Sequence, residues 1–241
     1  MRIKGATVLV TGSNRGLGRA LVQAFLDQGA GRIYAAVRAP SLARIDDPRV
    51  APIVLDVTAA ASVAAAADRC GDTDILVNNA ASLANSPCMG VADLSAARLE
   101  METNCWGVLA MCRAFAPSLA RRGGGAIVNI LSMGALASVP FAGSYCASKA
   151  AAWSMTQCMR AELARAGTQV AAVFPGPIAT DMARRGEEAG RCPPDVMAAA
   201  IVAALGRDNM MIFPAPVSAA ILSLFSVDPW ALEGRFAQSL D

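Results

Sequence analysis

Tyr145 and Lys149 lie four residues apart in the sequence, so both side chains would share one face of a helix. A phenol with a pKa of about 10 is a poor acid or base at neutral pH, but a neighbouring ammonium favours the phenolate and lowers that pKa. Such a pair can give a proton to a developing alkoxide or take one from an alcohol. Ser132 stands thirteen residues earlier, where its hydroxyl could meet the same substrate oxygen. An isolated pair of this kind is more often two unrelated surface residues, yet the chain has only two tyrosines.

A second candidate site is the glycine-rich segment TGSNRGLG at 11–18. Gly12, Gly16 and Gly18 allow a tight turn and let backbone N–H groups approach a pyrophosphate, to which the following helix adds its positive end. The spacing differs from the common G-x-G-x-x-G fingerprint, and an ordinary strand–helix turn is the alternative. The position between a predicted strand and a predicted helix favours a nucleotide.

The elements that must position these groups alternate between strand and helix along the whole chain. Near-continuous apolar runs separated by helices predict an α/β fold, a Rossmann-type doubly wound parallel sheet of about seven strands with helices on both faces. Strands are expected at 6–11, 32–37, 52–55, 74–77, 126–131, 169–174 and 210–213. Helices are expected at 16–28, 59–69, 98–121, 145–166 and 194–205. No break in composition is present, so we expect a single domain over 1–241, with a mobile substrate loop around 181–193.

Composition excludes several classes of function. The chain has no histidine, which rules out Ser-His-Asp and Cys-His catalysis and any metal site with a histidine ligand. The net charge is only +2 without a basic run, so we expect no nucleic-acid partner. The seven cysteines form no C-x-x-C pair and are expected as reduced thiols, with no metal site.

Membrane contact and secretion are not expected either. The uncharged stretch 209–227 approaches the length of a spanning helix, but Pro214 and Pro216 interrupt it. A strand followed by a short helix over 217–225 is the preferred interpretation. The first residues do not resemble a signal peptide, so we expect a cytoplasmic protein.

Taken together, the motifs resemble the short-chain dehydrogenase/reductase family of the classical type, in a carbonyl-reductase-like form. The resemblance extends from about residue 5 to residue 181. It rests on TGSNRGLG (11–18), Asp56 in LDVT, NNAA (78–81), Asn104, Ser132, YCASK (145–149) and PGPIAT (175–180), in the family's order. Two features depart from the family pattern: Ala81 replaces the last glycine of N-N-A-G, and the C-terminal V-D-G-G segment is missing.

The resemblance implies a catalytic tetrad of Asn104, Ser132, Tyr145 and Lys149. Tyr145 would be the general acid/base, Ser132 would orient the carbonyl, and Lys149 would lower the Tyr145 pKa and bind the nicotinamide ribose. Asn104 would hold a water in a proton relay to Lys149. The implied cofactor contacts are Gly12, Ser13, Asn14, Arg15, Gly16, Leu17, Gly18, Arg38, Asp56, Val57, Asn78, Ala80, Tyr145, Lys149, Pro175, Gly176, Ile178 and Thr180. Among them, Asp56 and Val57 would contact adenine, and Ile178 and Thr180 the nicotinamide carboxamide.

NADP(H) is the expected cofactor, because of the end of the second predicted strand. Proteins of this fold that bind NAD place an acidic residue there, which accepts hydrogen bonds from the ribose hydroxyls. Here the strand ends in Val37-Arg38, with no acid before Asp46. Arg15 in the glycine-rich turn can face the same 2′-phosphate, and two guanidinium groups suit a dianion.

The expected activity is NADPH-dependent reduction of a ketone or aldehyde, or the reverse oxidation of an alcohol. Reduction of an imine or enone in a biosynthetic pathway is the alternative, and a non-catalytic nucleotide-sensing protein on the same fold is a third hypothesis. The resemblance implies a homodimer, with a tetramer as the alternative, formed through the helices at 98–121 and 145–166. Residues that flank the catalytic groups in this family, and that could equally belong to the core, suggest an apolar substrate pocket: Leu83, Cys88, Met133, Phe141 and Met182.

Overall fold

Seven parallel strands form the central sheet of the protein, whose computed structural model describes residues 1–39, 45–91, 93–180 and 191–237. Their order is β3-β2-β1-β4-β5-β6-β7, so the winding direction reverses between β1 and β4. The strands are β1 (Thr7–Thr11), β2 (Arg32–Val37), β3 (Val50–Val54), β4 (Ile75–Asn78), β5 (Gly125–Ile130), β6 (Thr168–Val173) and β7 (Met211–Ile212). The predicted doubly wound α/β fold is confirmed, and ligands of such sheets bind beyond the carboxyl ends of the strands at the reversal.

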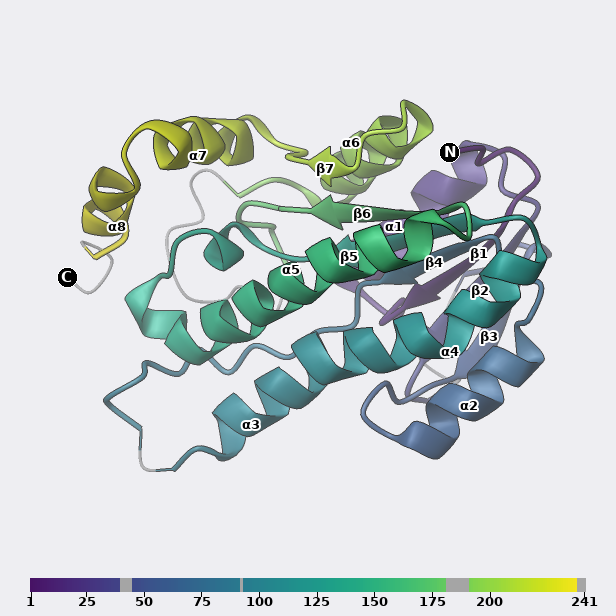
Figure 1. Cartoon of the computed structure of the whole chain (residues 1–241), viewed down its shortest axis with the longest axis horizontal. Coiled ribbons are helices and arrows are strands. Elements are labelled where there is room, and N and C mark those ends of the chain that lie inside the picture. Colours follow the sequence, from purple (N-terminus) through teal and green to yellow (C-terminus); the bar gives the residue numbers. More distant parts are fainter. Residues whose placement is uncertain (40–44, 92, 181–190, 238–241) are drawn as a thin grey trace.

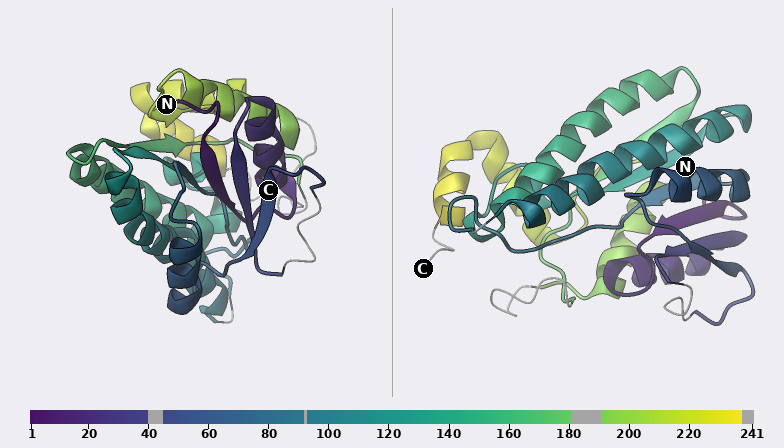
Figure 2. Two further views of the ribbon diagram at one scale, coloured as in Figure 1. Left: turned by 90° about the vertical axis from the view of Figure 1, so that its right-hand side faces the viewer. Right: turned by 90° about the horizontal axis from the view of Figure 1, so that it is seen from below.

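Helices cover both faces of this sheet (Figure 1 and Figure 2). On β1, Val8 and Val10 point into the core shared with α1 (Gly16–Asp27) and α6 (Pro194–Gly206). Leu9, between them, points to the opposite core, because successive strand residues alternate in direction. That second core is built with α2 (Ala60–Arg69), α4 (Gly107–Arg121) and α5 (Gly143–Ala164). Both faces of the central strands are therefore buried, which explains their continuous apolar sequence.

The predicted helix over 98–121 is interrupted in the structure. It consists of α3 (Ser95–Met101), a π-helical turn (Glu102–Trp106) and then α4. A π turn closes its hydrogen bonds one residue further along than an α turn, and such turns are frequent at functional sites. Here the turn contains Asn104, which is completely buried. No feature of the sequence over 98–121 indicates the interruption.

The other differences concern helix ends and the C-terminus. Helix α5 begins at Gly143 rather than Tyr145, which places Tyr145 in its first turn. The expected short helix after Pro216 is α7 (Pro216–Val227), and a further helix, α8 (Pro229–Ala237), was not predicted. Both lie at one end of the molecule (Figure 1), where Ile221 and the fully buried Leu232 pack with Phe174.

Within the described ranges, no helix is long and apolar enough to cross a membrane. The same residues contain no cluster of three or more Cys, Asp or Glu side chains that could hold a metal ion.

Candidate active site

The carboxyl ends of four neighbouring strands bring the predicted site residues to one edge of the sheet. The glycine-rich turn follows β1, Asn78 and Ala80 belong to the end of β4, Ser132 follows β5, and 175–180 follows β6. The edge is held together by backbone contacts, because Met133 N donates to Pro175 O at 3.1 Å. Residues far apart in sequence thus meet at the reversal of the sheet.

Ser132, Tyr145 and Lys149 come together at this edge. A hydrogen bond joins the side chains of Ser132 and Tyr145, and Ser132 Oγ also accepts from Gly134 N at 3.0 Å, which fixes the hydroxyl. Lys149 Nζ lies 5.8 Å from the centre of the Tyr145 ring. It donates a 2.8 Å hydrogen bond to Ile130 O at the end of β5, so the ammonium is held against the sheet. The arrangement offers a phenol beside a hydroxyl donor and a cation.

The pKa values of Tyr145 and Lys149 are shifted by burial. Burial raises the pKa of Tyr145 to about 12, and the hydrogen bond from Ser132 opposes this only in part. Burial also lowers the pKa of Lys149 to about 8. The Tyr145 pKa thus lies above its ordinary value rather than below it as expected, because removal from water outweighs the hydrogen bond from Ser132. The spacing of the two residues in the sequence does not report this burial.

Asn104 sits in the π-helical turn and has every polar atom of its side chain engaged. Its Oδ1 accepts from Ser82 N at 2.9 Å, and its Nδ2 donates to Ser82 O and to Ser148 Oγ, both at 2.9 Å. Ser148 Oγ in turn donates to Tyr145 O at 2.7 Å. The side chain therefore joins the loop after β4 to the helix that carries Tyr145.

The glycine-rich turn has the close approaches expected of a phosphate cradle. Gly12 and Gly16 have φ angles of 66° and 53°, which side chains rarely adopt. A Cβ at Gly12 would lie 2.9 Å from Ala80 Cα, and one at Gly18 would overlap the oxygen of Gly12. Helix α1 begins without a side-chain cap and without an acidic residue in its first turn. The described backbone is thus compatible with an anion at this helix end.

Asn79 is a structural residue of this turn that the sequence analysis missed. Its Nδ2 donates to Thr11 O at 2.8 Å and to Gly12 O at 3.3 Å, so it ties β4 to the turn after β1. The neighbouring Asn78 instead points away, and its Nδ2 donates to Asn129 Oδ1 at 2.8 Å. The repeated asparagine was the only signal, because the sequence alone did not distinguish which side chain faces which neighbour.

The residues expected around the adenosine half also gather near β1 and β2. Ser13 Oγ donates to Ala36 O at 3.2 Å, which fastens the glycine-rich turn to β2. The exposed side chains of Arg15 and Arg38 are carried by the two segments that this bond joins. Hydrogen bonds from Thr58 lower the pKa of Asp56, so its carboxylate stays charged. Val57, Asn78 and Ala80 line a small hollow together with Thr11, Thr103, Gly107 and Val108.

The remaining predicted residues divide between site and core. Thr180 lies against the glycine-rich turn, since a Cβ at Gly16 would be 3.2 Å from Thr180 Cγ2. Ile178 pairs with Cys192 in a short parallel bridge. Among the expected pocket residues, Leu83 and Phe141 are partly exposed, Cys88 is exposed, and Met133 is buried in a core cluster. Met182 lies outside the described residues, as does most of the expected substrate loop.

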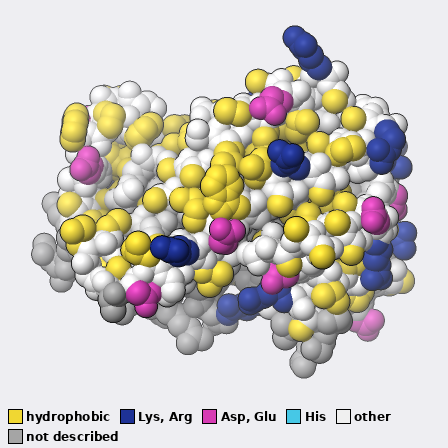
Figure 3. All heavy atoms as spheres, turned by 60° about the horizontal axis from the view of Figure 1, so that its bottom comes forward, with side chains coloured by type: hydrophobic (Ala, Val, Ile, Leu, Met, Phe, Trp, Pro, Cys, Tyr) yellow, Lys and Arg dark blue, Asp and Glu magenta, His cyan; other side chains and the backbone are white. Residues whose placement is uncertain are grey.

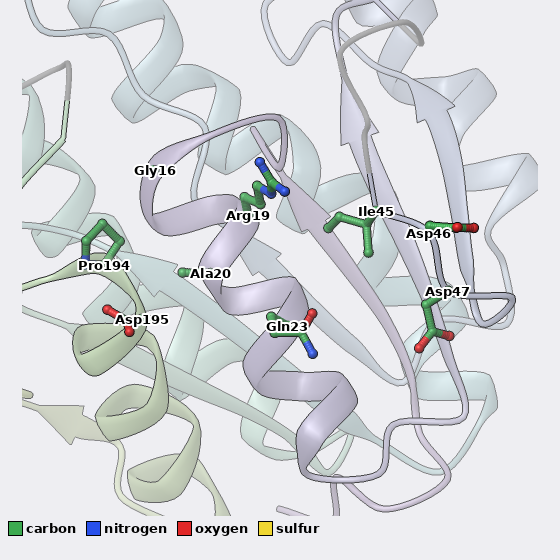
Figure 4. A pocket seen from close by; sticks show the side chains of 9 residues that line it. All are labelled: Gly16, Arg19, Ala20, Gln23, Ile45, Asp46, Asp47, Pro194 and Asp195. Carbon is green, nitrogen blue, oxygen red and sulfur yellow. The ribbon is translucent and has the colours of Figure 1, made fainter.

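A separate hollow of about 680 Å³ lies along α1 (Figure 4). Arg19, Gln23 and Ala20 line it from α1, with Asp46 and Asp195 on the facing segments. None of Ser132, Tyr145 and Lys149 lines it, so it is distinct from the candidate catalytic group. Ile45 on its rim directly follows the range 40–44, which is outside the described residues.

Comparison with known proteins gives consistent matches. The model of the short chain dehydrogenase family matches residues 6–190. A sorbitol dehydrogenase of Cereibacter sphaeroides is 40% identical over 184 residues, which are 73% of this chain and 72% of that protein. A short chain dehydrogenase from Burkholderia cenocepacia J2315, solved in complex with NADP, has a TM-score of 0.94 and 39% identity, and the match covers 98% of this chain and 99% of the other. A short chain dehydrogenase/reductase from Burkholderia phymatum in complex with NAD shares the fold with a TM-score of 0.82 at 24% identity, over 98% of this chain and 96% of that one.

Proposed function

Because the chain belongs to the short chain dehydrogenase family, we propose that it transfers a hydride between a nicotinamide cofactor and a carbonyl or alcohol group of a small molecule. The observation that carries this proposal is the grouping of Ser132, Tyr145 and Lys149 beside a glycine-rich turn at the reversal of the sheet. Few other chemistries need a phenol, a hydroxyl donor and a cation around one substrate oxygen.

The residues present fit a nicotinamide dinucleotide. The cradle at Gly12 and Gly18 leaves no room for a Cβ, the first turn of α1 is uncapped, and Asn78 Oδ1 is buried without a partner among the described residues. Residues 12–18 would hold the pyrophosphate, with Asp56 and Val57 toward the adenine. When bound, the cofactor supplies or accepts the hydride, and the protein supplies orientation and proton traffic.

The proton would move at the Tyr145 hydroxyl. In reduction Tyr145 donates its proton to the substrate oxygen, and in oxidation its phenolate accepts the proton of the alcohol. Ser132 donates a hydrogen bond to that same oxygen and fixes its position. The Lys149 ammonium, 5.8 Å from the centre of the Tyr145 ring, would favour the phenolate, against the burial that raises the Tyr145 pKa to about 12. Asn104 holds the helix turn that carries Tyr145 and is proposed to hold a water in the relay to Lys149.

Tyr145→Phe tests the assignment. The substitution removes the hydroxyl while the ring stays in place, and we expect turnover to fall by about 10²–10⁴, the usual contribution of general acid–base help. Tyr34→Phe is the matched control, because the Tyr34 hydroxyl donates to Asp72, away from the site. Nicotinamide absorbance with a panel of secondary alcohols and ketones is the measurement. Near-normal turnover of Tyr145→Phe would show that the mechanism is wrong.

NADP(H) is the proposed cofactor, supported by Arg38 and Arg15 on segments that Ser13 joins. Charge-assisted hydrogen bonds to a 2′-phosphate would be lost in Arg38→Ala, which should weaken NADPH binding by about ten- to a hundredfold and leave NADH binding nearly unchanged. Arg32→Ala, at the opposite end of β2, is the control. Equal calorimetric affinities of the unmodified protein for NADPH and NADH would overturn the preference.

For the substrate we propose a ketone or aldehyde, or the corresponding alcohol, with an apolar body. Leu83 and Phe141 are the apolar, partly exposed candidates near the catalytic group. The sorbitol dehydrogenase relative makes sugar alcohols the natural comparison. A panel of sorbitol against apolar secondary alcohols of similar size would decide between them, and better kcat/KM with sorbitol would contradict the apolar assignment.

A homodimer through the segment 98–121, which spans α3, the π-helical turn and α4, and through α5 is also proposed, with the chain acting as one domain. Two methionines of these helices, Met111 and Met159, are buried in the core of the same molecule and cannot contribute to such an interface. Figure 3 shows hydrophobic side chains gathered in the middle of the face on which α3 and α4 lie, and Leu99 and Trp106 are exposed by 54% and 46%. Light scattering at micromolar concentration should give twice the chain mass, and a monomer would refute the dimer.

A further inference from the structure

Helix α5 is joined to the loop after β4 twice, and the two connections have the same pattern. The first is made by Asn104, which contacts the backbone of Ser82 on one side and Ser148 of α5 on the other. The second begins four residues earlier on α3, at Glu100. The family resemblance already includes Asn104 of the first connection. The second connection therefore remains to be explained.

Glu100 uses both carboxylate oxygens in this second connection. Oε1 accepts a 2.7 Å hydrogen bond from Ala84 N, and Oε2 accepts a 2.5 Å hydrogen bond from Ser144 Oγ. Ser144 immediately precedes Tyr145 and stands four residues before Ser148. Glu100 likewise stands four residues before Asn104, so the spacing of the two connections is the same on both helical segments. One carboxylate thus bridges the loop near Leu83 and the first turn of α5.

The burial of Glu100 shows that this bridge needs its own explanation. The side chain is completely buried, and among the described residues no cation forms an ion pair with it. A carboxylate removed from water is costly unless hydrogen bonds compensate, and an apolar residue of similar size would avoid the cost. The role of Glu100 therefore lies in the two hydrogen bonds that it accepts, and not only in the volume that its side chain fills.

We propose that Glu100 is a positioning residue of this active site: it holds Ser144, and with it the Tyr145 hydroxyl, at a fixed place relative to the loop after β4. The proposal rests on the proposed oxidoreductase function. Glu100 acts through Ser144 and Ala84 and touches neither the substrate oxygen nor the glycine-rich turn. Its loss should therefore affect turnover more than cofactor binding, since small displacements of a reacting group cost rate.

The charge of Glu100 has a second effect on the same hydroxyl. Burial is the largest cause of the raised Tyr145 pKa; the neighbouring Cys146 and Glu100 raise it further, whereas Ser132 lowers it. Lys149 on α5 lies beside the Tyr145 ring, and Cys88 of the loop after β4 lies near Cys146. Removal of the Glu100 charge should consequently lower the Tyr145 pKa. Alcohol oxidation needs the phenolate, so its rate should begin to rise at a lower pH.

Glu100→Gln separates charge from contact. A glutamine can accept from Ala84 N and donate to Ser144 Oγ, so the bridge can persist while the charge is lost. We expect kcat within about threefold of wild type and a rise of the oxidation rate that begins roughly 0.3–1 pH unit lower. Glu102→Gln is the matched control, because Glu102 lies two residues away and is exposed. Identical pH profiles for Glu100→Gln, Glu102→Gln and wild type would contradict the electrostatic role.

Glu100→Leu removes the bridge itself. We expect kcat to fall by about 10- to 100-fold with the Kd of NADPH unchanged, and Glu100→Gln to restore most of the loss. If the leucine variant does not fold, Ser144→Ala removes one contact only and should lower kcat several-fold. Wild-type kcat in whichever of these two variants folds would overturn the proposal.

Hydrogen exchange gives a measurement that needs no substrate. The amide of Ala84 donates to Glu100 and should exchange faster in Glu100→Leu than in wild type or Glu102→Gln. Unchanged exchange across 82–88 would overturn the bridge even if activity were lost. If wild type turns over no alcohol or ketone, the proposed function fails, and the exchange result still decides whether Glu100 holds the loop.

Discussion

Lys149 carries a charge at a position where the fold strongly disfavours one. Its side chain is 2% exposed, and burial lowers its pKa from 10.5 to about 8. Below about pH 8 the lysine is protonated in both the folded and the unfolded chain, so the folded protein bears the full cost of the buried charge. Between about pH 8 and 10.5 the folded chain has lost the proton and the unfolded chain still binds it. Unfolding then takes up a proton, and stability must rise with pH.

The size of this effect follows from the gap between the two pKa values. About 2.5 pH units separate 10.5 from about 8, which corresponds to about 3 kcal/mol at about 1.4 kcal/mol per unit. Lys149→Met removes the titrating group and leaves Ile130 O without its donor. The lost hydrogen bond destabilises the variant by the same amount at every pH. It therefore does not change how the difference in free energy of unfolding between wild type and Lys149→Met depends on pH. Wild type should therefore gain about 3 kcal/mol relative to Lys149→Met between pH 7.5 and 10.5.

Urea unfolding of the cofactor-free proteins at several pH values in this window measures the difference directly. The only other lysine, Lys4, is exposed, so Lys4→Met supplies the same substitution without the burial. We expect the free energy of unfolding of Lys4→Met to follow that of wild type at every pH. Parallel curves for wild type and Lys149→Met would refute the reasoning, because Lys149 would then not titrate below its ordinary range.

Two further substitutions test the cradle and the C-terminal helices. Gly18→Ala should abolish measurable NADPH binding in calorimetry, since its Cβ would overlap Gly12 O and would lie 2.5 Å from Asn79 Nδ2, whereas Gly234→Ala, with open space around it, should bind normally. NADPH affinity within twofold of wild type for Gly18→Ala would show that the turn can relax. Leu232→Ala should lower the free energy of unfolding by about 2–5 kcal/mol, because this side chain of α8 is completely buried in the cluster with Phe174. An unchanged denaturation midpoint would mean that α8 packs only loosely.

The sheet and its site edge were predictable because their signals are local. Buried parallel strands have continuous apolar sequences, and the order of strand, glycine-rich turn and helix at 7–27 leaves few alternatives. The spacing of Tyr145 and Lys149 within one helix likewise required no knowledge of distant residues. Each of these features could be predicted because it depends on only a few neighbouring residues along the chain.

What the sequence could not show depends on contacts between distant segments. Asn104 is drawn inward by Ser82 and Ser148, which lie 22 and 44 residues away, and no periodicity marks the π-helical turn that results. The Tyr145 pKa was misjudged because it depends on burial, which a sequence spacing does not report. Helix α8 was missed because its only fully buried side chain, Leu232, packs against a cluster formed by much earlier residues.

The π-helical turn also makes the length of this segment part of the site. Each residue of an α-helix rotates the chain by about 100°, so the extra residue sets α3 out of angular phase with α4. Deleting one residue from Glu102–Trp106 would produce an unbroken and intrinsically better α-helix, with α4 still anchored in the core by Phe115. The same deletion would turn Glu100 by about a third of a revolution, away from Ser144. A shorter helix could therefore strengthen the fold while dismantling the support of Tyr145.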